Sequence, residues 1–298
     1  MLTVSKSEIE SYLPELKRVS RESGSLILDY YNGDPAAFNV QIKDDKTPVT
    51  AADRASHQHI VTAVGSIMPH IPIVSEEASE SQILVSRADI NVQQGTLLAL
   101  DPLDGTKEFL GRTGAFTVQM ILFQNFEPVL VVVYNPVFDV MYYATKDGGA
   151  WRQDGLNEPA AIHSRAAPTD KRRCLTALFN VTHGCLNTYA EARQWLAVRG
   201  LKIPVKPDGA PNLPRMMRVA EGGADINVVC GRGGLASGKM GHIWDYGTVL
   251  ILEEAGGVAV QFNTRQKLAF KDAFARVDAF VALGDRALAR RAFPGLRL

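Results

Sequence analysis

Residues 96–110 read TLLALDPLDGTKEFL, and this stretch sets the architecture of the 298-residue chain. Its first five residues are an apolar run that favours a buried strand, which delivers Asp101 at its C-terminal end. A proline then turns the chain, and Asp104 follows three residues after Asp101. Gly105 allows a sharp backbone turn before a helix that starts at Thr106. The pattern therefore predicts an acidic turn between a strand and a helix.

This turn offers oxygen ligands at a density that suits a hard cation. The Asp101 and Asp104 carboxylates can point to one side, with the Leu103 carbonyl between them. Mg²⁺ favours carboxylates, retained waters and phosphate oxygens, whereas zinc would require His or Cys ligands that the turn lacks. The N–H groups of Gly105 and Thr106 are expected to bind a phosphate at the helix N-terminus. One turn would then bind both metal and phosphate.

Further acidic residues stand at other element ends. A short buried strand at 71–75 runs into Glu76, and Asp245 opens an apolar helical run. Several carboxylates in one pocket repel each other unless cations offset their charge, which argues for two or more metals. In such a site the metal-activated water needs an orienting group and a proton acceptor. We expect the Thr106 hydroxyl, relayed to Asp53, to do this work.

Composition bounds the class of protein. The chain is 46% hydrophobic, and 32 basic residues balance 32 acidic ones, so no global charge favours nucleic acid or an anionic membrane. Three cysteines without CxxC spacing suggest no disulfide framework and fit a reducing cytoplasm. No apolar run approaches the roughly 20 residues of a membrane span. A soluble cytoplasmic protein is predicted, with the C-terminal arginines leaving peripheral membrane binding as an alternative.

The pattern of elements changes near residue 160. An N-terminal α+β half over 1–160 carries most of the acidic blocks, and an α/β half over 161–298 carries Asp245. The expected helices are 5–32 (one or two, depending on Pro14), one after Asp53, 188–198, one ending at Gly222, 245–255 and 285–293. The expected strands are 71–75, 96–100, 117–123, 129–134, 140–144, 175–179, 203–205, 225–229 and 279–283.

Five blocks in order resemble the inositol monophosphatase and bisphosphate nucleotidase superfamily. They are TPVTAAD at 47–53, SEE at 75–77, DPLDGTKEF at 101–109, Trp244-Asp245, and EEAGG at 253–257. The resemblance implies a layered αβαβα sandwich of the inositol monophosphatase and fructose-1,6-bisphosphatase type. It implies two or three Mg²⁺ ions, inhibition by lithium, and a homodimer as one option because many relatives pair.

The resemblance also implies roles for individual residues. The Mg²⁺ ligands would be Glu76, Asp101, the Leu103 carbonyl, Asp104 and Asp245. The catalytic residues would be Asp53, Thr106 and Glu76, of which Asp53 and Thr106 would activate the nucleophilic water. The substrate would contact Asp104, Gly105, Thr106, Arg215 and Asp245.

Residues near the acidic turn favour one substrate. Lys107-Glu108-Phe109 resembles the nucleotidase branch, whereas inositol phosphatases usually carry Thr-Asn-Phe there. Hydrolysis of adenosine 3′,5′-bisphosphate to AMP and phosphate is therefore expected. The segment 211–215 departs from the nucleotidase pattern and keeps only the positive charge of Arg215. The alternatives are an inositol monophosphatase, another small sugar or alcohol phosphate phosphatase including one for histidinol phosphate, and a metal-dependent phospholigand sensor without turnover.

Overall fold

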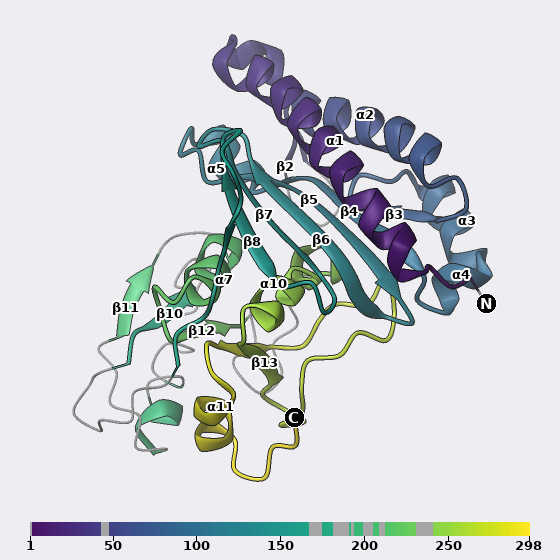
Figure 1. The fold of residues 1–298 in the computed structure, drawn as a ribbon. Coiled ribbons are helices and arrows are strands. Elements are labelled where there is room, and N and C mark those ends of the chain that lie inside the picture. Colours follow the sequence, from purple (N-terminus) through teal and green to yellow (C-terminus); the bar gives the residue numbers. More distant parts are fainter. Residues whose placement is uncertain are drawn as a thin grey trace. The chain divides into compact units, whose positions relative to one another are not determined.

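The chain divides into two compact units, each with its own sheet (Figure 1). The computed structural model describes residues 2–42, 48–166, 175–180, 191, 194–198, 205–208, 212–230 and 241–298. The first unit comprises residues 1–146, 151–160 and 271–273, and the second comprises 147–150, 161–270 and 274–298.

The first unit is built on a seven-stranded sheet in the order β3-β4-β5-β6-β7-β8-β9. The strands are β3 (Ile73–Ser75), β4 (Leu97–Asp104), β5 (Thr117–Gln124), β6 (Glu127–Asn135), β7 (Val140–Thr145), β8 (Ala150–Asp154) and β9 (Ala160–Ala161). β3 runs parallel to β4, and β4 to β7 are antiparallel. The strands predicted at 117–123 and 129–134 form a hairpin, in which Asn125 and Phe126 take φ angles of 54° and 60° in the tight turn between β5 and β6.

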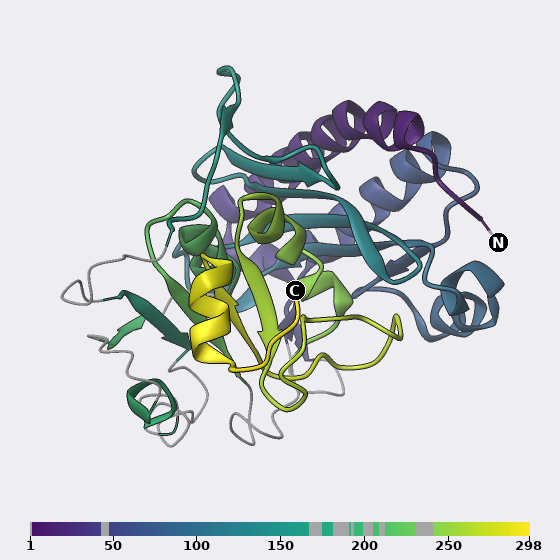
Figure 2. The same ribbon diagram turned by 60° about the horizontal axis from the view of Figure 1, so that its bottom comes forward.

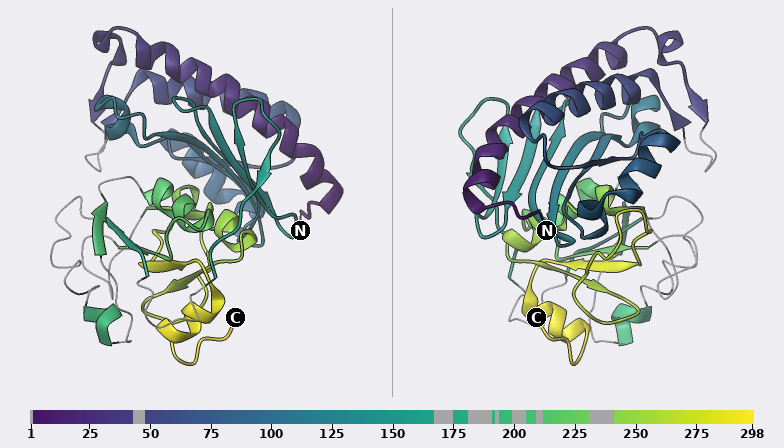
Figure 3. Two further views of the ribbon diagram at one scale, coloured as in Figure 1. Left: turned by 60° about the vertical axis from the view of Figure 1, so that its left-hand side comes forward. Right: turned by 90° about the vertical axis from the view of Figure 1, so that its right-hand side faces the viewer.

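Helices α1 (Lys6–Asn32) and α2 (Ala51–Ile67) lie side by side on one face of this sheet (Figures 1 and 3). A capping box of Ser5 and Glu8 starts α1, which continues as a single helix through Pro14. The expected start of α2 after Asp53 is wrong. Thr50 is the N-cap and Asp53 completes the capping box, so the helix begins two residues before Asp53.

Short elements connect the layers of the first unit. They are η1 (Pro35–Phe38), β1 (Gln41–Ile42), β2 (Pro48–Val49), α3 (Glu80–Ala88), α4 (Ile90–Gln93) and α5 (Thr106–Leu110). Helix α5 is anchored by Phe109, whose ring is fully buried and lies 5.0–5.5 Å from the rings of Tyr31, Phe38 and Phe116. This aromatic cluster fixes the acidic turn that precedes α5.

The second unit has a five-stranded sheet in the order β11-β10-β12-β14-β13. Its strands are β10 (Ala177–Asn180), β11 (Val205–Asp208), β12 (Ile226–Val229), β13 (Val258–Gln261) and β14 (Phe280–Leu283). β10 pairs in parallel with β11 and β12, whereas β14 is antiparallel to β12 and β13. The sheet is thus mixed, and β13 is a strand that the sequence pattern did not predict.

Helices cover both faces of this second sheet. α11 (Arg286–Ala292), the yellow helix of Figure 2, packs one face through Leu288. α7 (Asn212–Ala220) and α10 (Val249–Glu254) pack together on the opposite face (Figures 1 and 3). The helix expected over 245–255 is two helices, because α9 (Ile243–Tyr246) starts earlier, after His242, and ends before α10. Of the helix predicted at 188–198, residues 191 and 194–198 are described, and they are helical. Of the strand predicted at 203–205, only Val205 is described, and it begins β11.

Among the described helices, none combines the length and the apolar character that crossing a membrane requires.

Glu253 in α10 is a largely buried acid whose pKa is raised above its usual range. Burial causes the shift, and Lys267, whose Nζ lies 2.8 Å from Glu253 Oε2, opposes it. Within the described part of the chain, the buried Oε1 has no hydrogen-bond partner. The unfolded chain therefore releases this proton more readily than the folded protein. The contribution of Glu253 to the free energy of unfolding is therefore lost as the pH rises from its pKa in the unfolded chain, about 4.5, through its raised pKa in the folded protein.

Glu253→Gln is consequently expected to stabilise the protein at alkaline pH. At pH 8 its melting temperature should exceed that of the wild type by roughly 2–4 °C, the shift that about 1 kcal/mol produces at this chain length. The gain should shrink toward pH 4, where the acid is protonated in both states. Thermal unfolding followed by circular dichroism at both pH values measures it. An equal gain at both would rule out ionisation as the cause.

Candidate active site

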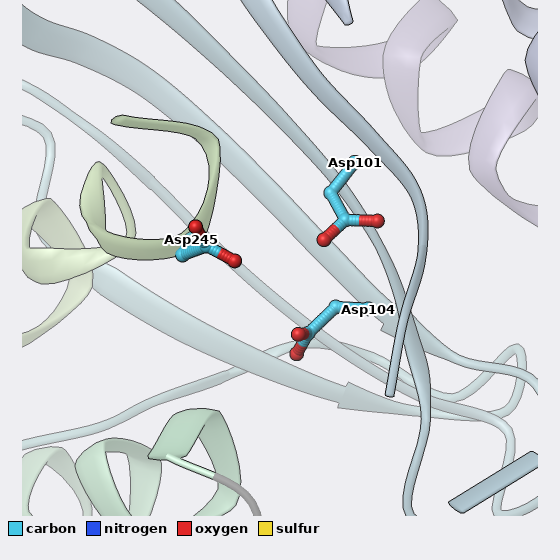
Figure 4. Close-up of side chains that lie close together, drawn as sticks. All are labelled: Asp101, Asp104 and Asp245. Atoms are coloured by element: carbon cyan, nitrogen blue, oxygen red, sulfur yellow. The ribbon is translucent and has the colours of Figure 1, made fainter. Parts of the chain in front are cut away.

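The acidic turn lies at the end of β4, where the strand changes register. Asp101 pairs with Gln119 of β5 and Asp104 pairs with Thr117, with a bulge between the two positions. Carboxylate oxygens of Asp101 and Asp104 lie within 4.8 Å of each other, and both side chains project from this stretch of β4 (Figure 4). A bulge re-aims side chains, so two acids three positions apart can converge. The predicted convergence of these two acids is confirmed.

The backbone of the turn is fixed by internal contacts. Leu103 N–H donates to Asp101 Oδ1 at 3.0 Å, and the Leu103 carbonyl lies 3.5 Å from the Thr106 hydroxyl. Gly105 takes a φ of 96°, and a Cβ there would lie 3.1 Å from the Ala115 carbonyl oxygen. A side chain at 105 would thus be both strained and crowded.

Glu76 emerges beside Asp101 at the same end of neighbouring parallel strands. Ser75, the last residue of β3, pairs with Leu100 of β4, and Glu76 N–H donates to the Leu100 carbonyl at 3.0 Å. Parallel strands that end together place the residues that follow them side by side. The predicted acidic strand ends are therefore adjacent in the first unit.

Asp53 and Thr106 form the contact that the sequence predicted. The Thr106 hydroxyl donates to Asp53 Oδ1 at 3.2 Å, while Asp53 Oδ2 accepts from the Thr50 N–H at 2.8 Å and from the Thr50 hydroxyl. The Asp53 side chain is buried. Burial raises its pKa, and the hydrogen bonds from Thr50 and Thr106 oppose that rise. A buried carboxylate with a raised pKa is a better proton acceptor.

Asp104 carries a large electrostatic penalty in this turn. Burial and the charges of Glu76 and Glu108 raise its pKa to about 7, against hydrogen bonds from Gln119 and Thr117. Gln119 is fully buried, and its Oε1 has no partner among the residues that the structure describes. A bound cation would offset the repulsion among these carboxylates. A water molecule that donates a hydrogen bond would satisfy the buried Gln119 Oε1. The residues of this turn fit a hydrated hard cation.

Sequence reasoning missed the contribution of β5. Thr117 and Gln119 face the two acids across the sheet, and their hydrogen bonds lower the pKa of Asp104. Their polar character in an otherwise apolar strand is the signal that was available. Its meaning depends on the bulge in β4, because only the shifted register sets Thr117 opposite Asp104. The sequence contains no sign of that shift.

The remaining predicted residues belong to the second unit. Asp245, also labelled in Figure 4, stands in the first turn of α9, where its Oδ2 accepts from the His242 N–H at 2.5 Å. A Cβ at Gly241 would come within 2.1 Å of that oxygen, so a side chain there would displace the Asp245 carboxylate. Trp244, which precedes Asp245, is buried, and its ring stacks on that of His242 with the centroids 4.5 Å apart.

Arg215 of α7 is fully buried, so it is not a solvated surface charge. Residues 231–240, which include the basic residues Arg232 and Lys239, lie outside the described residues. The roles of Arg215 and Asp245 at a shared centre stay predictions.

Comparison with known proteins gives the family. The model of the inositol monophosphatase family matches residues 8–286. The 3′(2′),5′-bisphosphate nucleotidase CysQ of Salmonella typhimurium is 38% identical over 157 residues, which are 52% of this chain and 61% of that protein. CysQ of Escherichia coli K12 is 37% identical over the same length. The match thus spans less than two thirds of these curated relatives.

Solved structures agree with the fold. CysQ from Bacteroides thetaiotaomicron is 26% identical with a TM-score of 0.69, covering 90% of this chain and 95% of that one. The extragenic suppressor protein suhB from Bartonella henselae is 21% identical with a TM-score of 0.69, covering 96% and 99%. These likenesses confirm the predicted fold class. The extent of the family match settles the assignment: the chain belongs to the inositol monophosphatase family.

Proposed function

We propose that the chain is a magnesium-dependent phosphomonoesterase that releases the 3′-phosphate of adenosine 3′,5′-bisphosphate. The observation that carries the proposal is the Thr106 to Asp53 hydrogen bond of 3.2 Å, which lies beside the paired acids Asp101 and Asp104. Hydrolysis of a phosphate ester by water needs a group that accepts the proton of the water and a cation that offsets charge on the phosphate, and these residues suit both roles. The family assignment supports the same chemistry.

The metal would be held by the residues of the acidic turn and its neighbours. In this proposal Glu76, Asp101, the Leu103 carbonyl and Asp104 come from the first unit, and Asp245 comes from the second. When bound there, Mg²⁺ would act as a Lewis acid toward the phosphate and would lower the pKa of a water molecule that it binds. The penalty at Asp104, whose pKa rises to about 7, supports a cation there because a cation would offset the crowded negative charge.

Asp53 and Thr106 would handle the proton of the attacking water. The Thr106 hydroxyl donates its own proton to Asp53 Oδ1, so its Oγ1 lone pairs point elsewhere and can accept a hydrogen bond from water. Proton transfer from that water to Oγ1, coupled to transfer from Oγ1 to Asp53 Oδ1, balances the step. Thr50 fixes Oδ2 of the same carboxylate and leaves Oδ1 for the relay.

The substrate proposal is supported by the names of the curated relatives and by one residue of α5, Lys107. The CysQ proteins are named 3′(2′),5′-bisphosphate nucleotidases. Within Lys107-Glu108-Phe109, Phe109 is fully buried in the aromatic cluster and cannot contact substrate. Lys107 is exposed. Its cationic side chain suits a substrate with a second phosphate.

A substrate panel tests the proposal. With Mg²⁺, phosphate release from adenosine 3′,5′-bisphosphate should exceed release from inositol 1-phosphate by about tenfold or more in kcat/KM, because one extra charge-assisted contact is worth about 1.5–3 kcal/mol. Adenosine 5′-monophosphate, which lacks the 3′-phosphate, is the matched control and should release little. The rates are measured by inorganic phosphate assay. The opposite ranking would identify an inositol-type phosphatase instead.

Two further arms separate the remaining alternatives. Histidinol phosphate in the same panel tests the third substrate class. Tight binding of the bisphosphate without phosphate release from any ester would identify a phospholigand sensor. Graded LiCl at fixed Mg²⁺, with NaCl as the ionic-strength control, tests the expected inhibition by lithium.

A further inference from the structure

Two buried serines connect the helical layer of the first unit to the acidic turn. Ser23 of α1 and Ser56 of α2 have their Oγ atoms 2.6 Å apart, and Ser56 Oγ donates to the Pro102 carbonyl at 2.7 Å. Both side chains are fully buried. The Pro102 carbonyl can only accept, so the single proton of Ser56 is committed to it. Ser23 must therefore be the donor to Ser56, which gives the hydrogen-bond chain one direction.

The acceptor of this chain belongs to the peptide that orients a predicted metal ligand. Pro102 C=O and Leu103 N–H are the two ends of one planar trans peptide and point in opposite directions. The carbonyl end is held by Ser56, and the N–H end donates to Asp101 Oδ1 at 3.0 Å. One peptide plane thus transmits the position of α2 to the carboxylate of Asp101.

The contact is unusual for a serine within a helix. Such hydroxyls commonly bond back to a carbonyl of their own helix, one turn earlier. Ser56 instead reaches a different element, 46 residues away in sequence. It stands on α2 three residues after Asp53, which accepts from Thr106 at the other end of the turn. Helix α2 therefore holds the turn at two points, before Leu103 and after Asp104.

We propose that Ser56 is a positioning residue that orients Asp101 for metal binding through the Pro102–Leu103 peptide, with Ser23 acting through Ser56. The inference rests on the proposed function, since it concerns the same metal centre. Removing the Ser56 hydroxyl leaves a buried carbonyl without its donor, and rotation of the peptide to find another partner would turn Leu103 N–H away from Asp101. Loss of an outer partner of a ligand typically weakens metal affinity by about 10–100-fold.

The chain provides a matched control. Ser20 is on α1 one turn before Ser23, is equally buried, and its Oγ has no partner among the residues described. Ser20→Ala, Ser23→Ala, Ser56→Ala and the double variant Ser23→Ala/Ser56→Ala would be stripped of metal. Mn²⁺ binding would then be titrated by electron paramagnetic resonance, with Mg²⁺ as competitor. This readout needs no turnover.

If Ser23 acts on the metal site only through Ser56, the four variants should differ in Mn²⁺ affinity in a defined order. Ser56→Ala should weaken Mn²⁺ binding about tenfold, and Ser20→Ala should leave it unchanged. Ser23→Ala should weaken it about two- to fivefold, and the double variant should match Ser56→Ala, because Ser23 has no other route to the turn. Thermal unfolding of the metal-free proteins distinguishes this positioning role from a purely structural one. A purely structural role would lower the melting temperature without changing the dissociation constant for Mn²⁺.

Defined results would overturn the proposal. Mn²⁺ affinity in Ser56→Ala equal to that in Ser20→Ala would remove Ser56 from the metal centre. If the double variant binds Mn²⁺ more weakly than Ser56→Ala does, Ser23 does not act through Ser56. If Ser56→Ala does not fold, the comparison of Ser23→Ala with Ser20→Ala decides. Wild-type protein that binds no Mn²⁺ would overturn the metal centre itself, a failure distinct from equal binding by all variants.

Discussion

Asp104→Asn is expected to lower Mg²⁺-dependent phosphate release by roughly a thousandfold, the scale on which losing a preorganised electrostatic group slows catalysis. The substitution keeps the shape of the side chain and removes the charge that a cation would need. Asp104 is the acid whose pKa is raised to about 7, first by burial and then by the neighbouring charges of Glu76 and Glu108. Steady-state phosphate release at saturating Mg²⁺ measures the loss, and Mn²⁺ titration should show weakened binding.

The same variant should remain folded, since Asn relieves the repulsion among the metal-free carboxylates. Its metal-free melting temperature at pH 8 should be no lower than that of the wild type. Glu10→Gln, which removes one charge from an exposed position of α1, is the matched control and should retain full activity. An unchanged rate in Asp104→Asn would place the metal centre elsewhere.

Thr106→Val is expected to reduce kcat by about a hundredfold or more, within the range that general acid–base catalysis contributes. Valine has nearly the shape of threonine but lacks the hydroxyl that lies 3.2 Å from Asp53 Oδ1. The acidic side chains remain in place, so KM should change little while kcat falls. Initial rates over a range of substrate concentrations separate the two parameters.

Thr106→Ser supplies the matched control, because it keeps the hydroxyl and removes only a methyl group. It should recover most of the wild-type kcat. A loss of similar size in both variants would point to packing of the methyl group at the start of α5. Equal activity of Thr106→Val and the wild type would remove Thr106 from the proton relay.

The sequence predicted the acidic turn because its information is local. Asp101, Asp104 and the glycine that follows are close in the chain, and an apolar strand before them fixes where the acids emerge. The blocks that resemble the inositol monophosphatase family extended this prediction to Asp53 and Glu76. The structure confirms the contact between Asp53 and Thr106, although 53 residues separate them.

The features that the sequence did not predict are the start of α2 and contacts that depend on strand register and on how helices pack. The predicted start of α2 is wrong because Asp53 lies in the first turn of the helix, where it forms a reciprocal capping box with the N-cap Thr50. The roles of Gln119 and Thr117 follow from a bulge, and that of Ser56 follows from how α2 lies on the sheet. A buried serine in a helix gives no pattern by which its distant partner could be recognised.

The capping box of α2 has a consequence for comparing sequences within this family. Asp53 both completes the start of the helix and faces Thr106, so a descendant that lost turnover would still be selected to keep it. Retention of this aspartate is therefore weak evidence of activity. The Thr106 hydroxyl, by contrast, caps no helix. Among divergent relatives, a threonine or serine at that position should track catalytic competence better than the aspartate does.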